Sequence, residues 1–194
     1  MTVELAEIAR YMRMGRSVPE GALADRVRKL RDEAVATVRP ARIWRRFALS
    51  DGAIVSGGVR LAVSGTLARH VDGCRDVYLV CGTIGADFDA FQRRASVSSG
   101  ADALIVQALG AALIERLMDS VEDEIRAELN EGETLVERYS PGYGTFPLSA
   151  QRELLALLDA PRKVGVSLTD TLLMVPSKSV SAIIGVRPAP SDLV

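Results

Sequence analysis

The chain has 194 residues, of which 48% are hydrophobic, 25% are charged and 5% are aromatic. This composition suits one domain with a real core, with room for a helical appendage. The formal net charge is −1, so no global field favours nucleic acid or an anionic membrane. No apolar run approaches the roughly 20 residues that span a bilayer, and the N-terminal segment lacks the pattern of a signal peptide. We therefore expect a cytoplasmic protein.

The cysteines and the histidine give little sign of a metal site. Cys74 and Cys81 are the two cysteines, with six residues between them, and His70 is the only histidine. No second cysteine pair or histidine cluster accompanies them, so we expect no bound metal. Cys81 lies in an apolar run and is interpreted as a small buried hydrophobe, whereas a reactive thiol stays open as an alternative for Cys74. His70 is interpreted as a surface or packing residue.

Two amphipathic helices are predicted at the N-terminus. In residues 2–14, apolar side chains recur at helical spacing. A second helix begins near Pro19 and carries a longer apolar stripe, formed by Leu23, Val27, Leu30, Ala34 and Val38. Pro40 ends this second helix. We interpret residues 1–42 as a helical appendage with a packing role, followed by a main domain over residues 43–194.

The following segment shows strand patterns. Residues 54–63 are rich in branched apolar side chains and are interrupted by Gly57-Gly58, which predicts a strand pair or a bulged strand. Residues 77–85 form a continuous apolar run that ends in glycines, as is typical of a central, covered strand. These glycines match neither Gly-x-Gly-x-x-Gly nor Gly-Lys-Ser, so both nucleotide-binding fingerprints are absent.

A long helix is predicted next, over roughly residues 101–129, with Ser98 or Ser99 as its cap. Its first half combines small residues with a broad apolar stripe, which favours close packing. Past Met118 its surface turns acidic, and we interpret this charge run as a solvated helix face.

The last third of the chain mixes short elements. A strand is predicted at residues 134–138, a helix at 151–158 and two strands at 172–176 and 182–186. The polar link between the last two strands predicts a hairpin, with 172–176 buried. The proline-rich residues after it, from Arg187 to Val194, are expected to fray.

One loop, residues 138–147, combines groups that suit a small charged ligand. Its two prolines and two glycines predict an irregular, shaped backbone that another group can approach closely. Arg138 adds a planar fork of donors suited to a carboxylate or a phosphate. Tyr143 adds an aromatic face with a polar tip. The alternative interpretation is a surface turn with a solvated arginine.

Three ordered segments resemble the reactivation domain of cobalamin-dependent methionine synthase. The first is the small-residue helix around Asp102–Leu109. The second is Arg138–Tyr143, which matches the family's Arg-x-x-x-Gly-Tyr signature, with Pro147 following. The third is Gly165–Asp170 with Met174–Ser181, which matches the family's Gly-x-x-Leu-Thr-Glu and Met-x-Pro-x-x-Ser-Val-Ser-Gly patterns. Together these segments and their spacing cover about half of the chain.

The resemblance implies an α+β fold, with a twisted antiparallel sheet and packed helices in a C-shaped arrangement. It implies binding of S-adenosylmethionine, whose methyl group restores an inactive cob(II)alamin in a reductive reaction. The electron comes from flavodoxin or a similar protein in that family. By resemblance, Arg138 engages the ligand's carboxylate, while Gly142 and Tyr143 hold it by close backbone approach and ring contact.

Further positions follow from the same resemblance. Ser140 and Pro141 shape the wall of the ligand site, and Ser179 and Ser181 resemble positions at the cofactor-facing edge of the sheet. The family's Pro-Ala-Cys-Pro is Gly144–Pro147 here, which places the larger Phe146 where the pocket mouth is expected.

The sequence departs from the family pattern elsewhere as well. The family's domain continues past the Ser-Val-Ser strand and contributes another tyrosine, whereas this sequence stops at Val194. The family's ligand-contacting acid has no clear counterpart, and Glu131 and Glu133 are candidates for an acidic role near Arg138. The cobalamin-ligand motif Asp-x-His-x-x-Gly is absent, so the cobalamin is expected on a partner, a methionine synthase or another corrinoid protein.

Three hypotheses remain. The first is a free-standing reactivation protein that binds S-adenosylmethionine. No catalytic residue is needed in this case, because the cobalt is the nucleophile and the protein only positions the methyl donor. The second is a non-catalytic adaptor that binds a corrinoid methyltransferase. The third is a structural subunit whose N-terminal helices bind a partner.

Overall fold

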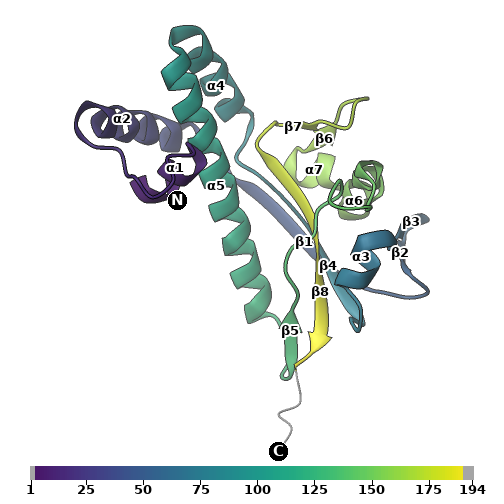
Figure 1. Ribbon diagram of the computed structural model, residues 1–194. Coiled ribbons are helices and arrows are strands. Elements are labelled where there is room, and N and C mark those ends of the chain that lie inside the picture. The colour runs from purple at the N-terminus through teal and green to yellow at the C-terminus, as the bar shows by residue number, and fades with distance from the viewer. Residues whose placement is uncertain (1–2, 190–194) are drawn as a thin grey trace, which may run out of the picture.

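The computed structural model describes residues 3–189 of the chain, and it combines helices with antiparallel strands (Figure 1). The elements follow in this order: α1 (Leu5–Tyr11), α2 (Gly21–Thr37), β1 (Ala41–Ala48), β2 (Ala53–Ser56), β3 (Val59–Ala62), α3 (Gly65–His70), β4 (Asp76–Thr83), α4 (Ala86–Ser98), α5 (Gly100–Ala127), β5 (Glu133–Leu135), the 3₁₀ turn η1 (Leu148–Ala150), α6 (Gln151–Leu158), α7 (Ala160–Val164), β6 (Ser167–Leu168), β7 (Met174–Val175) and β8 (Ser179–Pro188). The predicted α+β class is confirmed.

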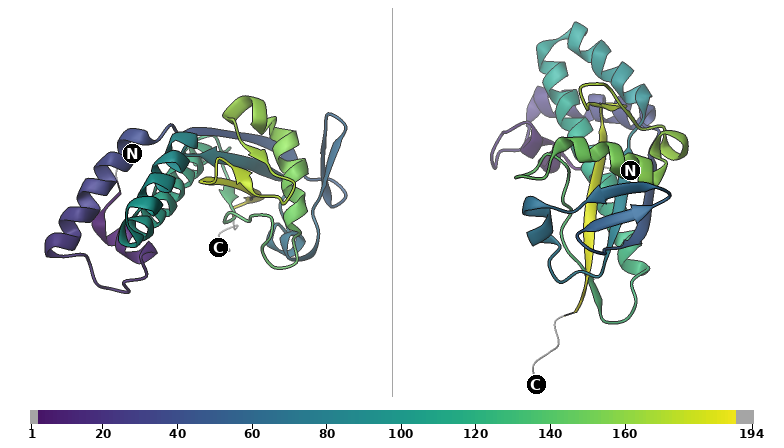
Figure 2. Two further views of the ribbon diagram at one scale, coloured as in Figure 1. Left: turned by 90° about the horizontal axis from the view of Figure 1, so that it is seen from above. Right: turned by 90° about the vertical axis from the view of Figure 1, so that its right-hand side faces the viewer.

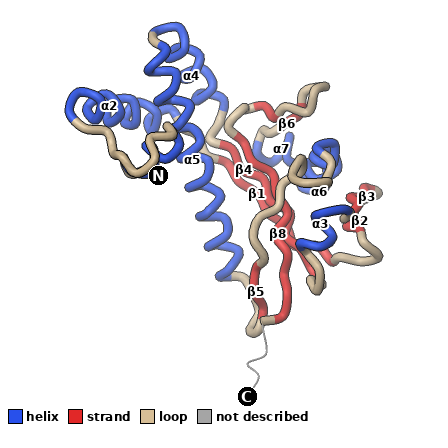
Figure 3. The backbone as a smooth tube through the Cα atoms, in the orientation of Figure 1, coloured by secondary structure: helices blue, strands red, loops and turns tan. Residues whose placement is uncertain are grey.

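A four-stranded antiparallel sheet forms the centre of the molecule, in the order β1-β4-β8-β5 (Figure 3). The two inner strands are β4 and β8, and nearly every residue of β4 is buried. The continuous apolar run around Val77–Gly82 explains this place, because a strand covered on both faces needs apolar side chains at every position. The prediction of a central strand is confirmed.

The two faces of the sheet bury different elements. Cys81, Leu79 and Ile183 point to the face covered by α6 and α7 and by the β2–β3 hairpin. Val80 and Ala182 point to the opposite face, where the second half of α5 packs. The view from above shows this order of layers, with the sheet between the long helix and the small helices (Figure 2). Alternation along each strand therefore sorts the core into two halves.

The helices α1, α2, α4 and the first half of α5 build a further apolar cluster beyond the end of the sheet. Ser99 caps α5 by accepting from the backbone amides of Ala101 and Asp102, as predicted. The buried carboxylate of Asp102 also pairs with Arg26, which ties α2 to α5. The division of the chain at residue 42 stays a prediction, since α1 and α2 share their core with α4 and α5.

Two predictions for the last third were wrong. Residues 172–176 do not form a buried strand paired with β8, because β7 is only two residues long and pairs with β6. Leu173 is 65% exposed and Val175 is 48% exposed. The link between β7 and β8 does not form a hairpin turn. Instead, Ser177 N donates to Asp89 on α4, and Lys178 O accepts from Ile84 N. Arg187, expected to fray, belongs to β8, while residues 190–194 lie outside the described part.

One ion-pair network joins the outer strands of the sheet. Arg46 on β1 donates to Asp76 on β4 and to both carboxylate oxygens of Glu133 on β5, at 2.6–2.9 Å for Glu133. Glu133 also accepts from Asn130 N at 3.0 Å. The Arg46 hydrogen bonds, followed by the backbone bond from Asn130, lower the pKa of Glu133 from 4.5 to about 2.

This network predicts an acid-sensitive contribution to stability. A carboxylate whose pKa is lowered by folding stabilises the folded state above its unfolded pKa, and the contribution is lost as the pH falls through the folded value. Glu133→Gln should therefore be less stable than the unchanged protein at neutral pH, and the difference should shrink between pH 4.5 and about 2. Urea denaturation across this pH range measures it. Glu131→Gln, an exposed neighbour, is the control, and a pH-independent difference for Glu133→Gln would contradict the prediction.

Candidate functional site

The loop of residues 138–147 starts as an extension of the sheet beside β8. Tyr139 N donates to Ile183 O, and Ile183 N donates to Tyr139 O, both at 2.9 Å. The ring of Tyr139 packs on the α6 side of the sheet. Because neighbouring residues in an extended segment point to opposite faces, Arg138 points to the α5 side.

Arg138 is held there by three carboxylates of α5. Its Nε lies 2.8 Å from Glu122 Oε1, and its Nη2 lies 3.1 Å from Glu115 Oε2 and 3.0 Å from Asp119 Oδ1. The arginine side chain is 20% exposed, while the side chains of Glu115 and Asp119 are 41% and 59% exposed. Arg126 also pairs with Glu122, with its Nη2 2.8 Å from Glu122 Oε2, so the two arginines and the three carboxylates leave a local excess of one negative charge. The remaining nitrogen, Arg138 Nη1, is buried without a hydrogen-bond partner among the described residues.

These contacts correct two interpretations of the acidic residues. The acidic second half of α5 is not only a solvated face, because part of it binds Arg138. Glu115, Asp119 and Glu122 are spaced at i, i+4 and i+7, which places them on one face of the helix. This spacing is visible in the sequence and could have predicted that the three carboxylates lie close together. Glu133 does not serve Arg138, since it pairs with Arg46 on the far strand.

The middle of the loop is closed by its own backbone and pinned to α3. Gly142 N donates to Phe146 O at 2.9 Å, and Phe146 N donates to Tyr143 O at 3.0 Å. The hydroxyl of Thr66 accepts from Thr145 N at 3.0 Å and from Tyr139 Oη at 2.6 Å. A Cβ at Gly144 would lie 2.5 Å from that hydroxyl, so only glycine allows this approach.

The aromatic residues of the loop divide into buried and exposed ones. Phe146 is 1% exposed and belongs to the core, so it does not lie at a pocket mouth as expected. Tyr139 packs against His70 with ring centroids 4.8 Å apart and ring planes tilted by 41°, and His70 Nε2 lies 2.7 Å from Glu137 O. His70 is therefore in a packing role, as predicted. Tyr143 is 66% exposed, and its ring is open to a ligand.

The two serines of β8 lie apart from Arg138. Ser179 and Ser181 are 7% and 2% exposed, and both point to the α6 side, since Ser181 pairs with Cys81 in the sheet register. Ser179 Oγ donates to Pro176 O at 2.7 Å. Ser181 Oγ is buried without a partner among residues 3–189. The structure does not bring these side chains together with Arg138, and their ligand role stays a prediction.

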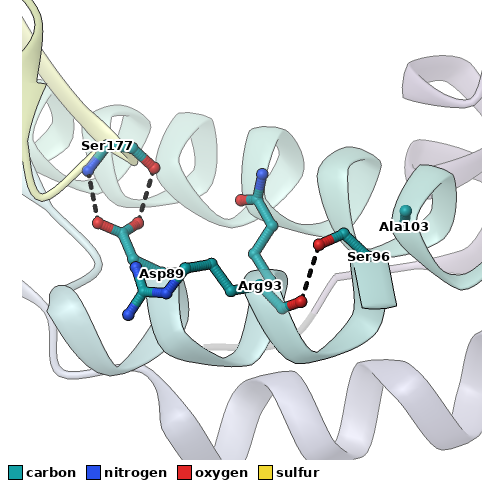
Figure 4. Close-up of a pocket in the computed structure, with 6 residues that line it drawn as sticks. Asp89, Arg93, Ser96, Ala103 and Ser177 are labelled. Atoms are coloured by element: carbon teal, nitrogen blue, oxygen red, sulfur yellow. Dashed lines mark hydrogen bonds between the residues drawn. The ribbon is translucent and has the colours of Figure 1, made fainter. Parts of the chain in front are cut away.

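A polar pocket of about 220 Å³ lies where α4, α5 and the β7–β8 link meet (Figure 4). Asp89 on α4 accepts from Ser177 N at 2.9 Å and from Ser177 Oγ at 2.7 Å. Both carboxylate oxygens are used in this way, so Asp89 anchors the link and fixes where β8 begins.

Lys178 is a half-buried cation in the segment that was predicted to be a polar link between two strands. Its stem crosses α5 at Gly110, where a Cβ would lie 2.6 Å from Lys178 Cε and from Phe88 Cε1. The ammonium donates to Gln107 Oε1 at 3.0 Å. Burial lowers the pKa of Lys178. The contact depends on how α4 and α5 cross, which no local pattern reveals.

Neither thiol has the lowered pKa of a reactive cysteine. Burial raises the pKa of Cys81 to about 12 and also raises the pKa of Cys74. A nucleophilic thiol needs the opposite shift, so the reactive alternative for Cys74 is disfavoured. Within residues 3–189, no cluster of three or more His, Cys, Asp or Glu side chains could hold a metal ion. In the same range, no helix combines the length and apolarity required to cross a membrane.

The fold and the loop define an antiparallel α+β domain with a shaped, cation-bearing loop beside its central strand. The family described as vitamin B12 dependent methionine synthase, activation domain, matches residues 77–192. Because this match spans more than half of the chain, the chain belongs to that family.

Solved structures agree with the family at the level of the fold. The chain is similar to a structure described as the MetH reactivation domain bound to AdoHcy, with 16% sequence identity and a TM-score of 0.56. The similarity covers 90% of this chain and 69% of that one. At this identity the likeness shows the fold alone. No curated protein matches the chain.

Proposed function

We propose that this chain binds S-adenosylmethionine at the loop of residues 138–147 and presents its methyl group to a cobalamin carried by a partner protein. The partner is a cobalamin-dependent methionine synthase or another corrinoid protein, and a flavodoxin-like protein or another reductant supplies the electron. The family match carries the proposal. A fold shared with a reactivation domain bound to AdoHcy, the demethylated product of S-adenosylmethionine, supports it.

The loop offers one group for each part of this ligand. Arg138 donates to the carboxylate, and Gly142, whose backbone is exposed, allows close approach. The open ring of Tyr143 contacts the ligand, while Ser140 and the buried Pro141 shape the wall. Ser179 and Ser181 remain proposed ligand positions from the family pattern.

The charges around Arg138 suit a zwitterion with an additional cation. S-adenosylmethionine carries one carboxylate, one ammonium and one sulfonium. The carboxylate pairs with Arg138, and Glu115 and Asp119, whose ion pairs among the described residues are to Arg138 alone, then face the two cationic groups. Glu115 and Asp119 are the more exposed of the three carboxylates around Arg138, so they can leave Arg138 at least cost when the ligand enters.

The residues of this chain then work by positioning. The partner's cobalamin supplies the nucleophile that takes the methyl group when it is bound nearby. Arg138 fixes the amino-acid end of the donor, and the pinned backbone of residues 142–146 holds the loop still. No general acid or base is required, because no proton moves in the transfer.

One observation favours the adaptor as a second candidate. Arg138 already forms ion pairs with three carboxylates of α5, so its charge is compensated without a ligand. A chain that binds a corrinoid methyltransferase but no S-adenosylmethionine would keep this cluster as a structural brace.

Titration calorimetry with S-adenosylmethionine separates these candidates. We expect saturable heat at sub-millimolar ligand, and absence of heat rejects the proposed function. A second measurement adds a corrinoid methyltransferase in its cob(II)alamin form with a reductant. Recovery of methyl transfer supports reactivation, whereas binding of the two proteins without recovery supports the adaptor.

A further inference from the structure

Two Gly-Thr pairs, Gly65-Thr66 at the start of α3 and Gly144-Thr145 in the loop, face each other. Thr66 Oγ1 accepts from Thr145 N at 3.0 Å, and in return Thr145 Oγ1 accepts from Thr66 N at 3.0 Å. A Cβ at Gly144 would lie 2.5 Å from Thr66 Oγ1, and a Cβ at Gly65 would collide with Thr145 Oγ1. The threonine of each pair therefore lies against the glycine of the other, and we call this contact the Gly-Thr clasp.

The α3 side of the clasp is the fixed one. Leu67, which follows Thr66, is fully buried in the core that α6 shares. Ser64 precedes α3 without a side-chain hydrogen bond to it, so the Thr145 hydroxyl takes the place of an N-terminal cap. Tyr139 Oη also donates to Thr66 Oγ1, at 2.6 Å. Thr66 is thus joined to the loop at two separate points.

The loop side has few other polar contacts that hold it. Residues 142–145 are all exposed, between the buried Pro141 and Phe146. Several hydrogen bonds lie within the loop and shape its turn. Among the described residues, every hydrogen bond from residues 142–146 that leaves the loop of 138–147 ends on Thr66. One side chain of α3 therefore sets where this segment lies relative to the rest of the protein.

The clasp leaves one backbone donor of the segment open. The amides of the other residues in 142–146 donate to acceptors within the protein. Gly144 is exposed, and its N–H has no acceptor among the described residues. The peptide unit of Gly144 N also contains Tyr143 O, which accepts from Thr66 Oγ1 at 3.4 Å. Since a trans peptide points its N–H opposite to its C=O, the Gly144 N–H points away from Thr66.

Both features are additions to the family's pattern. The family has Pro-Ala where this chain has Gly144-Thr145, and proline has no N–H while alanine has no hydroxyl. The segment of residues 64–70 that completes the clasp lies outside residues 77–192, which match the family. The clasp therefore does not follow from family membership.

We infer, on the basis of the proposed function, that Thr66 is a positioning residue for the methyl donor. It holds residues 142–146 in the binding conformation and directs the Gly144 N–H toward an acceptor of the bound S-adenosylmethionine. A segment that is already ordered does not have to be ordered when the ligand arrives. Without the clasp, the binding conformation is one of several, and the apparent affinity falls with the fraction of molecules that adopt it.

Titration calorimetry with S-adenosylmethionine on Thr66→Val and Thr66→Ser tests this role. Valine keeps the shape of threonine and removes the hydroxyl, so Thr66→Val should bind about tenfold more weakly, as when about a tenth of the molecules adopt the binding conformation. Thr66→Ser keeps the hydroxyl and should bind as the unchanged protein does. Thr37→Val is the matched control, because the Thr37 hydroxyl donates to Ala34 O within α2, and its affinity should not change.

Two further measurements separate positioning from a general loss of stability. Hydrogen exchange of the Thr145 amide, followed by NMR without ligand, should be faster in Thr66→Val and unchanged in Thr37→Val. Thr145→Val removes the other hydroxyl of the clasp at an exposed position, and it should also weaken binding. The double variant with Thr66→Val should lose less affinity than the product of the two single losses, because both hydroxyls belong to one contact.

Three results overturn the inference. The first is unchanged affinity in Thr66→Val and Thr145→Val although the unchanged protein binds S-adenosylmethionine. The second is an equal loss in Thr66→Val and Thr66→Ser, since the hydroxyl would then not be the cause. The third is a lower stability of Thr66→Val in urea without any loss of affinity, which assigns Thr66 a structural role alone. Absence of heat with the unchanged protein rejects the proposed function itself, and with it this inference.

Discussion

Arg138→Ala is expected to weaken S-adenosylmethionine binding by about 1.5–3 kcal/mol, roughly ten- to more than a hundredfold, as for a lost charged hydrogen bond. The effect is large because Arg138 is the one cation that pairs with Glu115 and Asp119 among the described residues. Its removal takes away the partner of the ligand's carboxylate and also leaves the carboxylates of Glu115 and Asp119 without their cation. Arg138→Lys should recover only part of the loss, because lysine lacks the planar fork. Calorimetry measures both variants.

Arg162→Ala is the matched control for this experiment. Arg162 on α7 is 76% exposed, and its one ion pair among the described residues is with Asp159, which directly precedes that short helix. Its removal should leave the affinity unchanged. If Arg138→Ala folds and binds S-adenosylmethionine as tightly as the unchanged protein, Arg138 does not hold the carboxylate and its cluster with α5 is structural.

Gly85→Ala is expected to destabilise the protein by about 3 kcal/mol or more, through strain and overpacking together. Gly85 joins β4 to α4 with φ +92° and ψ 161°, a region open almost only to glycine. A Cβ there would also lie 2.8 Å from Arg39 O, in the backbone that leads into β1. That backbone cannot move freely, because Arg39 N donates to Ile84 O at 2.9 Å. Urea denaturation at neutral pH measures the loss.

Gly73→Ala is the comparison variant for this experiment. Gly73 has φ +76° but nothing within 4 Å of an added Cβ, so it reports the conformational strain alone, about 1–2 kcal/mol. A loss of stability in Gly85→Ala no larger than that in Gly73→Ala would contradict the prediction, because Gly85 combines a less accessible backbone conformation with the contact to Arg39.

Much of the fold was predictable because its strongest patterns are local. The unbroken apolar run of β4 marked a covered strand, and Gly57-Gly58 marked the turn between β2 and β3. Ser99 stood at the position of a helix cap before a long apolar stripe. Each of these signals depends on residues that lie next to one another in the chain.

The errors concern contacts between distant segments. Residues 172–176 have the composition of a buried strand, yet β7 pairs with β6 at the surface because the following link is fastened to α4 by Asp89. Phe146 looked like a change at a pocket mouth, but the fold buries it under α6. The composition of a loop does not show which of its apolar side chains will be buried in the core.

The candidate site was predicted as a loop and not as a set of contacts. The residue types of 138–143 indicated a cation, a close backbone approach and a ring, and the structure shows an exposed Tyr143 and a Gly144 that closes on α3. The three carboxylates around Arg138 were missed, because their helix and the loop meet only in the folded protein.

The order of strands in the sheet has a consequence for how the protein is made. The inner strands β4 and β8 are separated along the chain by every helix from α4 to α7. On a ribosome, β4 emerges with only β1 beside it, and its second edge stays unpaired until residues 179–188 follow. An apolar strand with an open edge is prone to join other chains, and distant pairing is slow. We therefore expect that chaperones must cover the open edge of β4 in the nascent chain until β8 pairs with it.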